Sequence, residues 1–312
     1  MRAPVFLGID VGGTTTSAGL VTPAGRVVVS RHRPTHGGGG GDAVPRVLAL
    51  ATEVAGLARP RGYRVAGVGA GVPGIVHGAT GTVGGEAHNV PELGGVPMAR
   101  LLSRALGVPA AVDNDVNALA LGESTWGAGR GARSLVLLAL GTGVGGGIVI
   151  DGRLYRGAAG FGGELGHVPV KFDGRPCVCG ARGCLKAYVA GPDLAAEGAR
   201  RLGRPVDTAE LFRLAAEGQA AATAVVDEAL EALAAGLTII VNGLNPERLL
   251  LAGGIARALA PRAAELRARL ARRAYAGALA TTRLRFLRLD KRTTVRGGAA
   301  LARHAAIRRT RA

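Results

Sequence analysis

Aromatic side chains are scarce in this chain of 312 residues, of which they make up 3%. Proteins that hold single-stranded nucleic acid stack its bases on aromatic rings, so the scarcity argues against that class. The chain also lacks any apolar run near the ~20 residues that a membrane-spanning helix needs. Its first residues lead directly into an apolar strand and show no signal-peptide pattern. We therefore expect a cytoplasmic protein without membrane or nucleic-acid partners.

Lysine is nearly absent, because arginine supplies almost all of the 39 cationic side chains that give a formal net charge of +17. The arginines are scattered along the chain, and no nucleic-acid recognition motif accompanies them. A GC-rich genome that favours arginine and alanine codons explains this composition better than a nucleic-acid surface does. A positive surface would still attract an anionic substrate such as ATP.

Cysteine occurs only at Cys177, Cys179 and Cys184, and all three follow His167 closely. Disulfides are less favoured than metal binding here, because one His and three Cys at this spacing suit a closed tetrahedral zinc site. Four protein ligands leave no open position for water, so we expect the zinc to be structural. A reducing compartment suits such a cluster.

Apolar strands alternate with amphipathic helices along the first part of the chain, which predicts an α/β fold with helices packed on a mixed sheet. Residues 22–25 are expected to form a hairpin turn and residues 35–41 a glycine-rich loop. Strands are expected at 5–9, 17–21, 26–30, 65–69 and 110–112, and helices at 43–58, 98–106 and 115–126.

A second unit begins near residue 130 and repeats the opening of the first: a strand, a glycine turn and another strand. This repeat predicts duplicated halves that face each other across a cleft. We place a small domain at 1–120, with a C-terminal helix at 296–312 packing back on it, and a large domain at 121–295. The large domain is expected to hold strands at 134–140, 146–150 and 248–251, helices at 193–202, 208–216 and 219–241, and one helical stretch from 254 to 273.

Two glycine-rich turns follow apolar strands, and their backbone N–H groups can approach and bind phosphates. One glycine turn alone is often only a hairpin, but two of them favour a nucleotide. A carboxylate at the end of the first strand suits Mg²⁺ held through water, and glycines at a later helix start would let adenosine lie against the backbone. The residues are Asp10, Gly12, Gly13, Thr14 and Thr15, then Gly141, Thr142 and Gly143, then Gly253 and Gly254.

Polar side chains at two further places suit a substrate that carries hydroxyl groups. Asp115 ends a strand and opens a helix, where a carboxylate can take the proton of an attacking hydroxyl. Asn114 and its acidic neighbours can equally cap that helix. Glu164 and His167 are three residues apart and share one face of a helical turn. His167 can ligate zinc through one ring nitrogen and offer the other to a substrate hydroxyl.

Together these motifs resemble those of ROK-family sugar kinases, nearest the bacterial glucokinases, from about residue 5 to residue 301. The resemblance implies a two-lobed, hexokinase-like and actin-like ATPase (ribonuclease H-like) fold that closes on a sugar in an interlobe cleft. It implies ATP with Mg²⁺ as the usual donor, with polyphosphate as an alternative, and a homodimer or homotetramer. It assigns Asp115 as the base for the 6-hydroxyl, and Asn89, Asn114, Glu164 and His167 as partners of other hydroxyls.

Two residues depart from the family pattern. Lys186 stands where the family has a glutamate that accepts from sugar hydroxyls, and lysine can only donate. Thr15 stands where a lysine commonly follows the threonine of the first phosphate motif. We expect phosphorylation of glucose to glucose 6-phosphate. The alternatives are another hexose or aminosugar (N-acetylglucosamine, N-acetylmannosamine, fructose or a kanosamine-like sugar) or a non-catalytic sugar-binding member. A repressor of the same family is disfavoured, because the first four residues leave no room for its helix-turn-helix domain.

Overall fold

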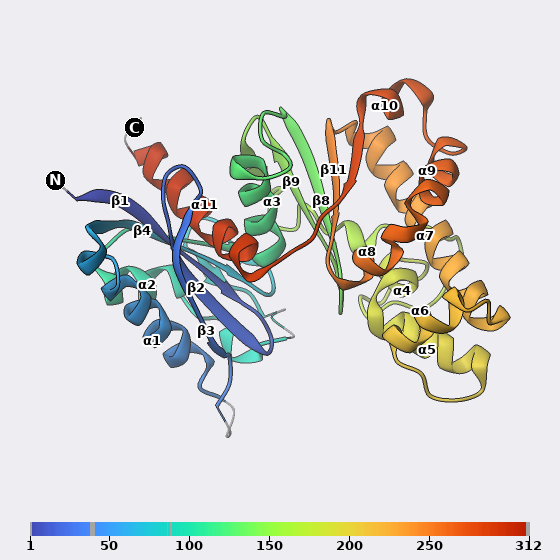
Figure 1. Ribbon diagram of the computed structural model, residues 1–312, viewed down its shortest axis with the longest axis horizontal. Helices are drawn as coiled ribbons and strands as arrows, with labels where there is room; N and C mark the ends of the chain where they lie inside the picture. The colour runs from blue at the N-terminus through green and yellow to red at the C-terminus, as the bar shows by residue number, and fades with distance from the viewer. Residues whose placement is uncertain (1, 38–40, 86, 88, 310–312) are drawn as a thin grey trace. The chain divides into compact units, whose positions relative to one another are not determined.

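The computed structural model describes residues 2–37, 41–85, 87 and 89–309, and it comprises two compact units (Figure 1). The first unit takes in Met1–Arg133, Gly147–Gly162 and Leu289–Ala312, and the second takes in Ser134–Gly146 and Gly163–Arg288. None of the described helices is long and apolar enough to cross a membrane.

The first sheet has the strand order β3-β2-β1-β4-β7. Its β1, β2 and β3 form an antiparallel meander, whereas β4 and β7 run parallel to β1. The strands are β1 (Ala3–Val11), β2 (Thr15–Val21), β3 (Val27–Pro34), β4 (Tyr63–Val72) and β7 (Ala110–Asn114), and a small hairpin of β5 (Val76–His77) and β6 (Thr82–Val83) follows β4. The helices of this part are α1 (Ala43–Gly56), α2 (Met98–Leu106), α3 (Asp115–Trp126) and α11 (Lys291–Arg309), with single 3₁₀ turns at Arg59–Arg61 and Pro91–Leu93.

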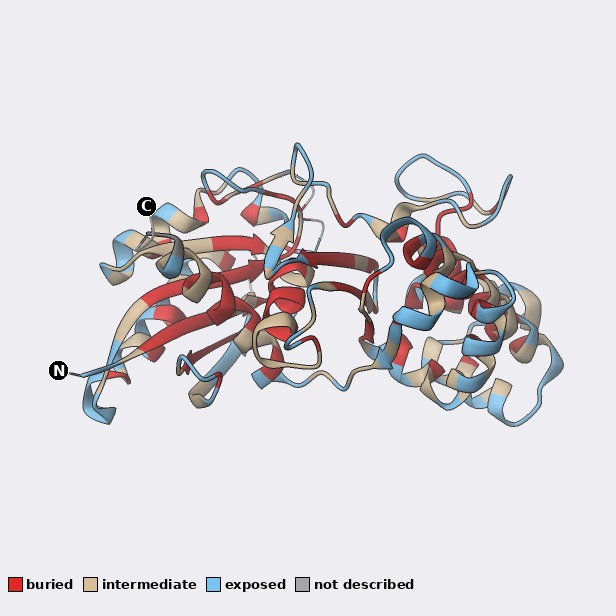
Figure 2. Cartoon of the chain, turned by 90° about the horizontal axis from the view of Figure 1, so that it is seen from above, coloured by how far each residue is buried: buried red, intermediate tan, exposed pale blue. Residues whose placement is uncertain are grey.

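Helices cover both faces of this sheet, so its central strands are buried along most of their length (Figure 2). Along β1, Leu7 and Ile9 belong to a cluster with Val47 of α1 and other buried residues. Phe6 points to the opposite face and packs with Val295 of α11. The alternation of side chains along a strand thus divides β1 between two cores.

Helix α11 packs directly on the backbone of β1 and β4 (Figure 1). Gly8 and Gly69 permit this approach, because a Cβ at either position would collide with a carbonyl oxygen of α11, that of Val295 or Gly298. The C-terminal helix therefore brings its first turn to the end of β1 where Asp10 lies. The helix begins at Lys291, five residues before the predicted start, because Asp290 caps it by accepting from the Thr293 N–H at 2.7 Å.

The second sheet repeats the order of the first, as β10-β9-β8-β11-β12. β10 pairs antiparallel with β9, whereas β11 and β12 follow β8 in parallel. This topology confirms the predicted repeat. The strands are β8 (Ser134–Leu140), β9 (Val144–Ile150), β10 (Arg153–Tyr155), β11 (Arg248–Ala252) and β12 (Arg283–Phe286), and the helices after them are α4 (Lys186–Val189), α5 (Gly191–Leu202), α6 (Thr208–Ala216), α7 (Ala220–Leu244), α8 (Gly254–Leu259), α9 (Ala263–Ala271) and α10 (Ala276–Thr281), with 3₁₀ turns at Leu165–His167 and Ala260–Arg262.

Three local expectations need correction or completion. The helical stretch predicted from 254 to 273 is present, but it divides into α8, a 3₁₀ turn and α9, because Pro261 lacks an N–H. The expectations named neither α10 nor β12, whose Arg-Leu-Arg-Phe sequence alternates exposed and part-buried side chains. Of the predicted glycine loop at 35–41, residues 38–40 lie outside the described residues.

Candidate active site and metal centre

The start of α3 holds Asp115 in a fixed position at the end of β7. Asn114 is the N-cap, and its Oδ1 accepts from the backbone N–H groups of Val116 at 2.9 Å and Asn117 at 3.2 Å. Its Nδ2 donates to the carbonyl of Gly74 at 3.1 Å, which ties α3 to the loop after β4. The capping alternative for Asn114 is thus what the structure shows. Its binding of a sugar hydroxyl stays a prediction.

The environment of Asp115 suits a general base. Burial and the nearby negative charge of Asp10 raise the pKa of its carboxyl from 3.8 to about 7. A hydrogen bond from the Val116 N–H, at 2.8 Å from Oδ1, opposes the shift only in part. A base with a pKa near neutrality can exist ionised and still accept a proton effectively.

An ion pair between the buried Asp113 and the part-buried Arg156 supports this helix start, and the sequence did not predict it. Asp113 is 3% exposed, and its Oδ2 accepts from Arg156 Nε at 2.7 Å and from the Arg156 terminal nitrogen at 2.6 Å. Its Oδ1 accepts from Asn117 Nδ2 at 2.9 Å and from the Asn114 N–H at 2.8 Å. The Asp-Asn-Asp sequence signalled that one carboxylate would be structural, but nothing in it identified Arg156 as the partner.

Asp10 lines a hollow of about 290 Å³ within the first unit, together with Thr15, Lys291 and Thr294. Burial raises the pKa of the Asp10 carboxyl, and a hydrogen bond from the Thr294 side chain partly counteracts the rise. Lys291 is exposed and stands at the first position of α11. It brings a cation to the hollow that Thr15 also lines. Sequence reasoning missed it because the two residues lie at opposite ends of the chain.

The turn between β1 and β2 is fastened by Thr35, which is fully buried. The Thr35 hydroxyl donates to the carbonyl of Gly12 at 2.6 Å, and its N–H donates to the carbonyl of Thr14 at 3.0 Å. Within the turn, the Gly12 N–H donates to the carbonyl of Thr15 at 3.1 Å. The Gly12 amide therefore shapes the turn itself. Asn89 is exposed. It lies beside this turn, because a Cβ on Gly13 would be 3.3 Å from the Asn89 carbonyl oxygen.

The second glycine turn, between β8 and β9, is built in the same way. The Gly141 N–H donates to the carbonyl of Gly143 at 2.9 Å, and the Gly141 carbonyl accepts from the N–H of Gly191 at 2.8 Å. Gly253 precedes α8 with a φ of 99°, and a Cβ there would collide with the carbonyl of Leu140. The structure thus gathers all the predicted phosphate-side glycines of the second unit around the ends of β8 and β11.

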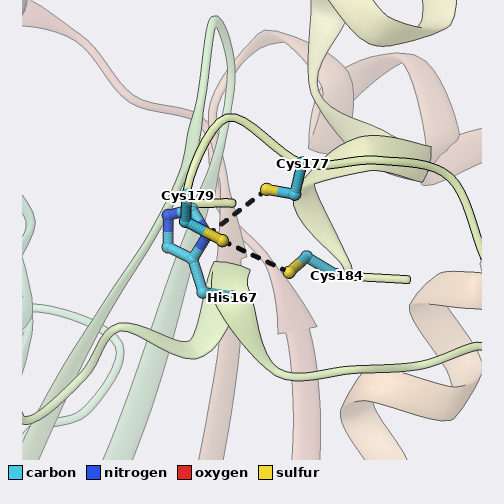
Figure 3. Close-up of side chains that lie close together, drawn as sticks. All are labelled: His167, Cys177, Cys179 and Cys184. Carbon is cyan, nitrogen blue, oxygen red and sulfur yellow. Dashed lines mark hydrogen bonds between the residues drawn. The ribbon is translucent and has the colours of Figure 1, made fainter. Parts of the chain in front are cut away.

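His167, Cys177, Cys179 and Cys184 converge in the second unit (Figure 3). One ligand atom of each lies within 4.8 Å of the others, with Cys179 Sγ 3.7 Å from Cys184 Sγ and Cys177 Sγ 3.5 Å from His167 Nδ1. In a tetrahedral site with Zn–S bonds of about 2.3 Å, ligand atoms are roughly 3.7 Å apart. The donor set and its spacing therefore fit zinc.

Arg175 anchors the same loop from its other side. Its guanidinium lies 4.6 Å from the centre of the Tyr188 ring and pairs with Glu228 of α7 at 2.6 Å. Its backbone N–H donates to the Tyr188 hydroxyl at 2.9 Å. Arg175 thus attaches the loop that carries Cys177, Cys179 and Cys184 to α7.

Glu164 and Lys186 flank the zinc ligands in sequence. Glu164 is exposed and immediately precedes the 3₁₀ turn that carries His167, and the pKa of its carboxyl is raised by burial of part of the group. Lys186 Nζ pairs with Asp193 Oδ2 of α5 at 2.9 Å. Lys186 therefore has a carboxylate partner in its own unit, which sequence reasoning had not identified.

Comparison with known proteins supports the expected family. The chain matches the ROK family over residues 6–305. It is 36% identical over 268 residues to a glucokinase of Thermotoga maritima, covering 81% of this chain and 83% of that one. A ROK hexokinase of Thermus thermophilus has a TM-score of 0.85 at 34% identity, and the match covers 99% of this chain and 100% of that one. A ROK glucokinase of Streptomyces griseus, solved with glucose and AMPPNP, has a TM-score of 0.75 at 27% identity, with 96% and 99% covered. These matches confirm the α/β fold with two sheets.

Proposed function

From the premise that the chain belongs to the ROK family, we propose that it is an ATP-dependent sugar kinase that phosphorylates a hexose at O6, with glucose as the first substrate. The observation that carries the proposal is Asp115, a carboxyl held at the start of α3 with a pKa of about 7. The matched relatives include glucokinases and a solved complex with glucose and AMPPNP.

Asp115 accepts the proton of the sugar 6-hydroxyl as its oxygen attacks the terminal phosphorus of ATP. Proton acceptance of this kind accelerates a transfer by about 10²–10⁴-fold. Asn114 holds the helix start with both of its amide atoms, and Asp113 is neutralised by Arg156. Asp115 is therefore the carboxylate of this segment that is available for the reaction.

The donor side uses backbone amides and a cation. The turn residues Gly13, Thr14 and Thr15 approach the phosphates in the first unit, and Lys291 adds a positive charge beside Thr15. The turn at residues 141–143 and the glycines at 253–254 take the remaining nucleotide contacts. Asp10 would hold Mg²⁺ through water, and the ion would neutralise charge on the transferred phosphoryl group.

The sugar side combines amide, carboxylate and imidazole groups, which suit neutral vicinal hydroxyls. Asn89 contributes from the first unit, and Glu164 and His167 contribute from the second. His167 keeps Nε2 for a hydroxyl if Nδ1, the atom near Cys177, ligates zinc. Zinc would then fix the loop that carries Glu164 and His167 without entering the reaction.

The Lys186–Asp193 pair favours a second candidate, a kinase of another hexose or an aminosugar. Where Lys186 stands, the resemblance predicts an acceptor. Lys186, which is paired with Asp193, offers a hydrogen-bond donor at this position where the family has an acceptor. A non-catalytic sugar-binding member is the remaining alternative. We further propose a cytoplasmic homodimer or homotetramer, which light scattering on the purified protein would test.

The test is a coupled assay of ADP release with MgATP over glucose, mannose, fructose, N-acetylglucosamine, N-acetylmannosamine and kanosamine. We expect the highest kcat/KM with glucose. A maximum with an aminosugar would replace the first candidate by the second. With polyphosphate in place of ATP no ADP forms, so turnover is then followed as formation of the sugar phosphate. Absence of sugar-stimulated turnover with every sugar and with both donors would reject the kinase.

A further inference from the structure

The first unit contains a cavity of about 450 Å³ that includes none of the residues predicted for the sugar, nucleotide or metal. Cavities that hold small molecules measure about 300–1,000 Å³. Its walls come from β7, from α3 and α11, from the loop at residues 78–81 and from the hairpin strand β10. The volume therefore suffices for a ligand the size of a monosaccharide derivative.

The charge in this cavity has one sign. Its ionisable lining residues are Arg153, Arg156 and His304, and no aspartate or glutamate lines it. Arg153 is exposed and forms no ion pair with any residue in the described ranges. Arg156 directs Nε and one terminal nitrogen to Asp113, so its other terminal nitrogen keeps its donors for the cavity. Arg153 thus brings a positive charge without a carboxylate partner among the described residues, and Arg156 adds guanidinium donors, which together favour an anion such as phosphate.

The backbone of β7 supplies hydrogen-bonding groups of both kinds. β7 is the edge strand of the first sheet, and it pairs only with β4 among the described strands. Ala110, Ala111 and Val112 of this edge line the cavity, and an edge strand carries N–H and C=O groups on its outer side that have no strand partner. Thr80 adds a hydroxyl. Alternating donors and acceptors suit a ligand that carries hydroxyl groups.

We propose that this cavity is a second ligand site that binds the phosphate monoester of a small polyol. The ligand class, a phosphate monoester, is inferred from the residues that line the cavity. The identification of hexose 6-phosphate as the physiological ligand rests on the proposed function. Arg156 joins the site to the start of α3, because it also holds Asp113, two residues before Asp115.

Titration calorimetry on the full chain without ATP tests the site, with glucose 6-phosphate, glucose 1-phosphate and inorganic phosphate as separate probes and saturating glucose present. We expect both sugar phosphates to bind more tightly than inorganic phosphate. Arg153→Ala should weaken them by about 10-fold or more, the usual range for a charged hydrogen bond. Arg64→Ala removes an exposed arginine of β4 outside the cavity and should bind as the wild type does.

A second variant tests whether the ligand occupies the volume of this cavity. Ala305→Phe adds a ring to α11 where this residue lines the cavity, and it should abolish binding of both sugar phosphates. Should it fail to fold, Arg153→Ala decides alone. Equal affinity in the wild type and in Arg153→Ala, or a Kd above about 10 mM for every probe, would overturn the proposal. Asp115→Asn should leave this binding unchanged. Calorimetry measures binding and needs no catalysis, so failure of the kinase assay would be a separate result.

Discussion

Replacement of Asp115 by asparagine removes the proposed base and keeps the size of the side chain. We expect kcat to fall by about 10²–10⁴-fold, which corresponds to roughly 3–5 kcal/mol of transition-state stabilisation. The KM for the sugar should change little, because the amide oxygen still accepts hydrogen bonds. The coupled ADP-release assay measures both constants under the same conditions.

The pH dependence provides a stricter test of the same residue. Burial and the charge of Asp10 raise the pKa of Asp115 from 3.8 to about 7, so at pH 6 about one molecule in ten carries the base ionised. The kcat/KM of the wild type should rise about tenfold from pH 5 to pH 6 and level off above pH 7. Asp115→Asn should show no such limb.

The stability of the folded protein should fall as pH rises, whereas kcat/KM should increase. A carboxyl whose pKa is raised by folding makes the folded state bind more protons than the unfolded state between pH 4 and pH 7. The wild type should therefore lose stability as pH rises through this window, and Asp115→Asn should melt at a higher temperature than the wild type at pH 8. The difference should shrink at pH 4.

Asp151→Asn is the matched control, because Asp151 is exposed and its φ of 47° is one that asparagine adopts readily. It should retain wild-type kcat and the same pH profile. Turnover of Asp115→Asn within about threefold of the wild type, or an unchanged acid limb in that variant, would refute the assignment of the base.

Three further perturbations test other parts of the site. Cys184→Ser should lower the zinc content measured by mass spectrometry and reduce the melting temperature; full zinc retention would contradict the proposed ligand set. Lys291→Ala should raise the KM for ATP by about 10-fold, the range of one charged hydrogen bond, and Thr15→Lys in the same chain should recover part of it; an unchanged KM would place Lys291 away from the phosphates. Lys186→Glu should shift the sugar preference and, because it faces Asp193, lower the melting temperature; an identical sugar profile would show that Lys186 does not contact the substrate.

The sequence by itself determined the parts that are local. The convergence of His167 with the three cysteines, the glycine turn after β1 and the Asn114–Asp115 helix start could be predicted because each is a short motif whose residues lie close together along the chain. The repeat of strand, turn and strand likewise predicted that the two sheets begin in the same way, whereas their full shared strand order was not predicted. Hydrophobic periodicity identified most strands and helices, but it runs on across Pro261, where the structure divides the helical stretch.

Only the tertiary structure decided which distant residues become neighbours. Arg156 neutralises Asp113 across 43 residues, and Lys291 reaches the hollow of Asp10 and Thr15 because glycines let α11 rest on β1 and β4. Ionic partners of this kind carry no spacing or period in the sequence, since an ion pair needs only two opposite charges that the fold brings within reach. Sequence thus predicts which groups the chain possesses, and packing decides whether a carboxylate is neutralised, as in Asp113, or left with the raised pKa of Asp115.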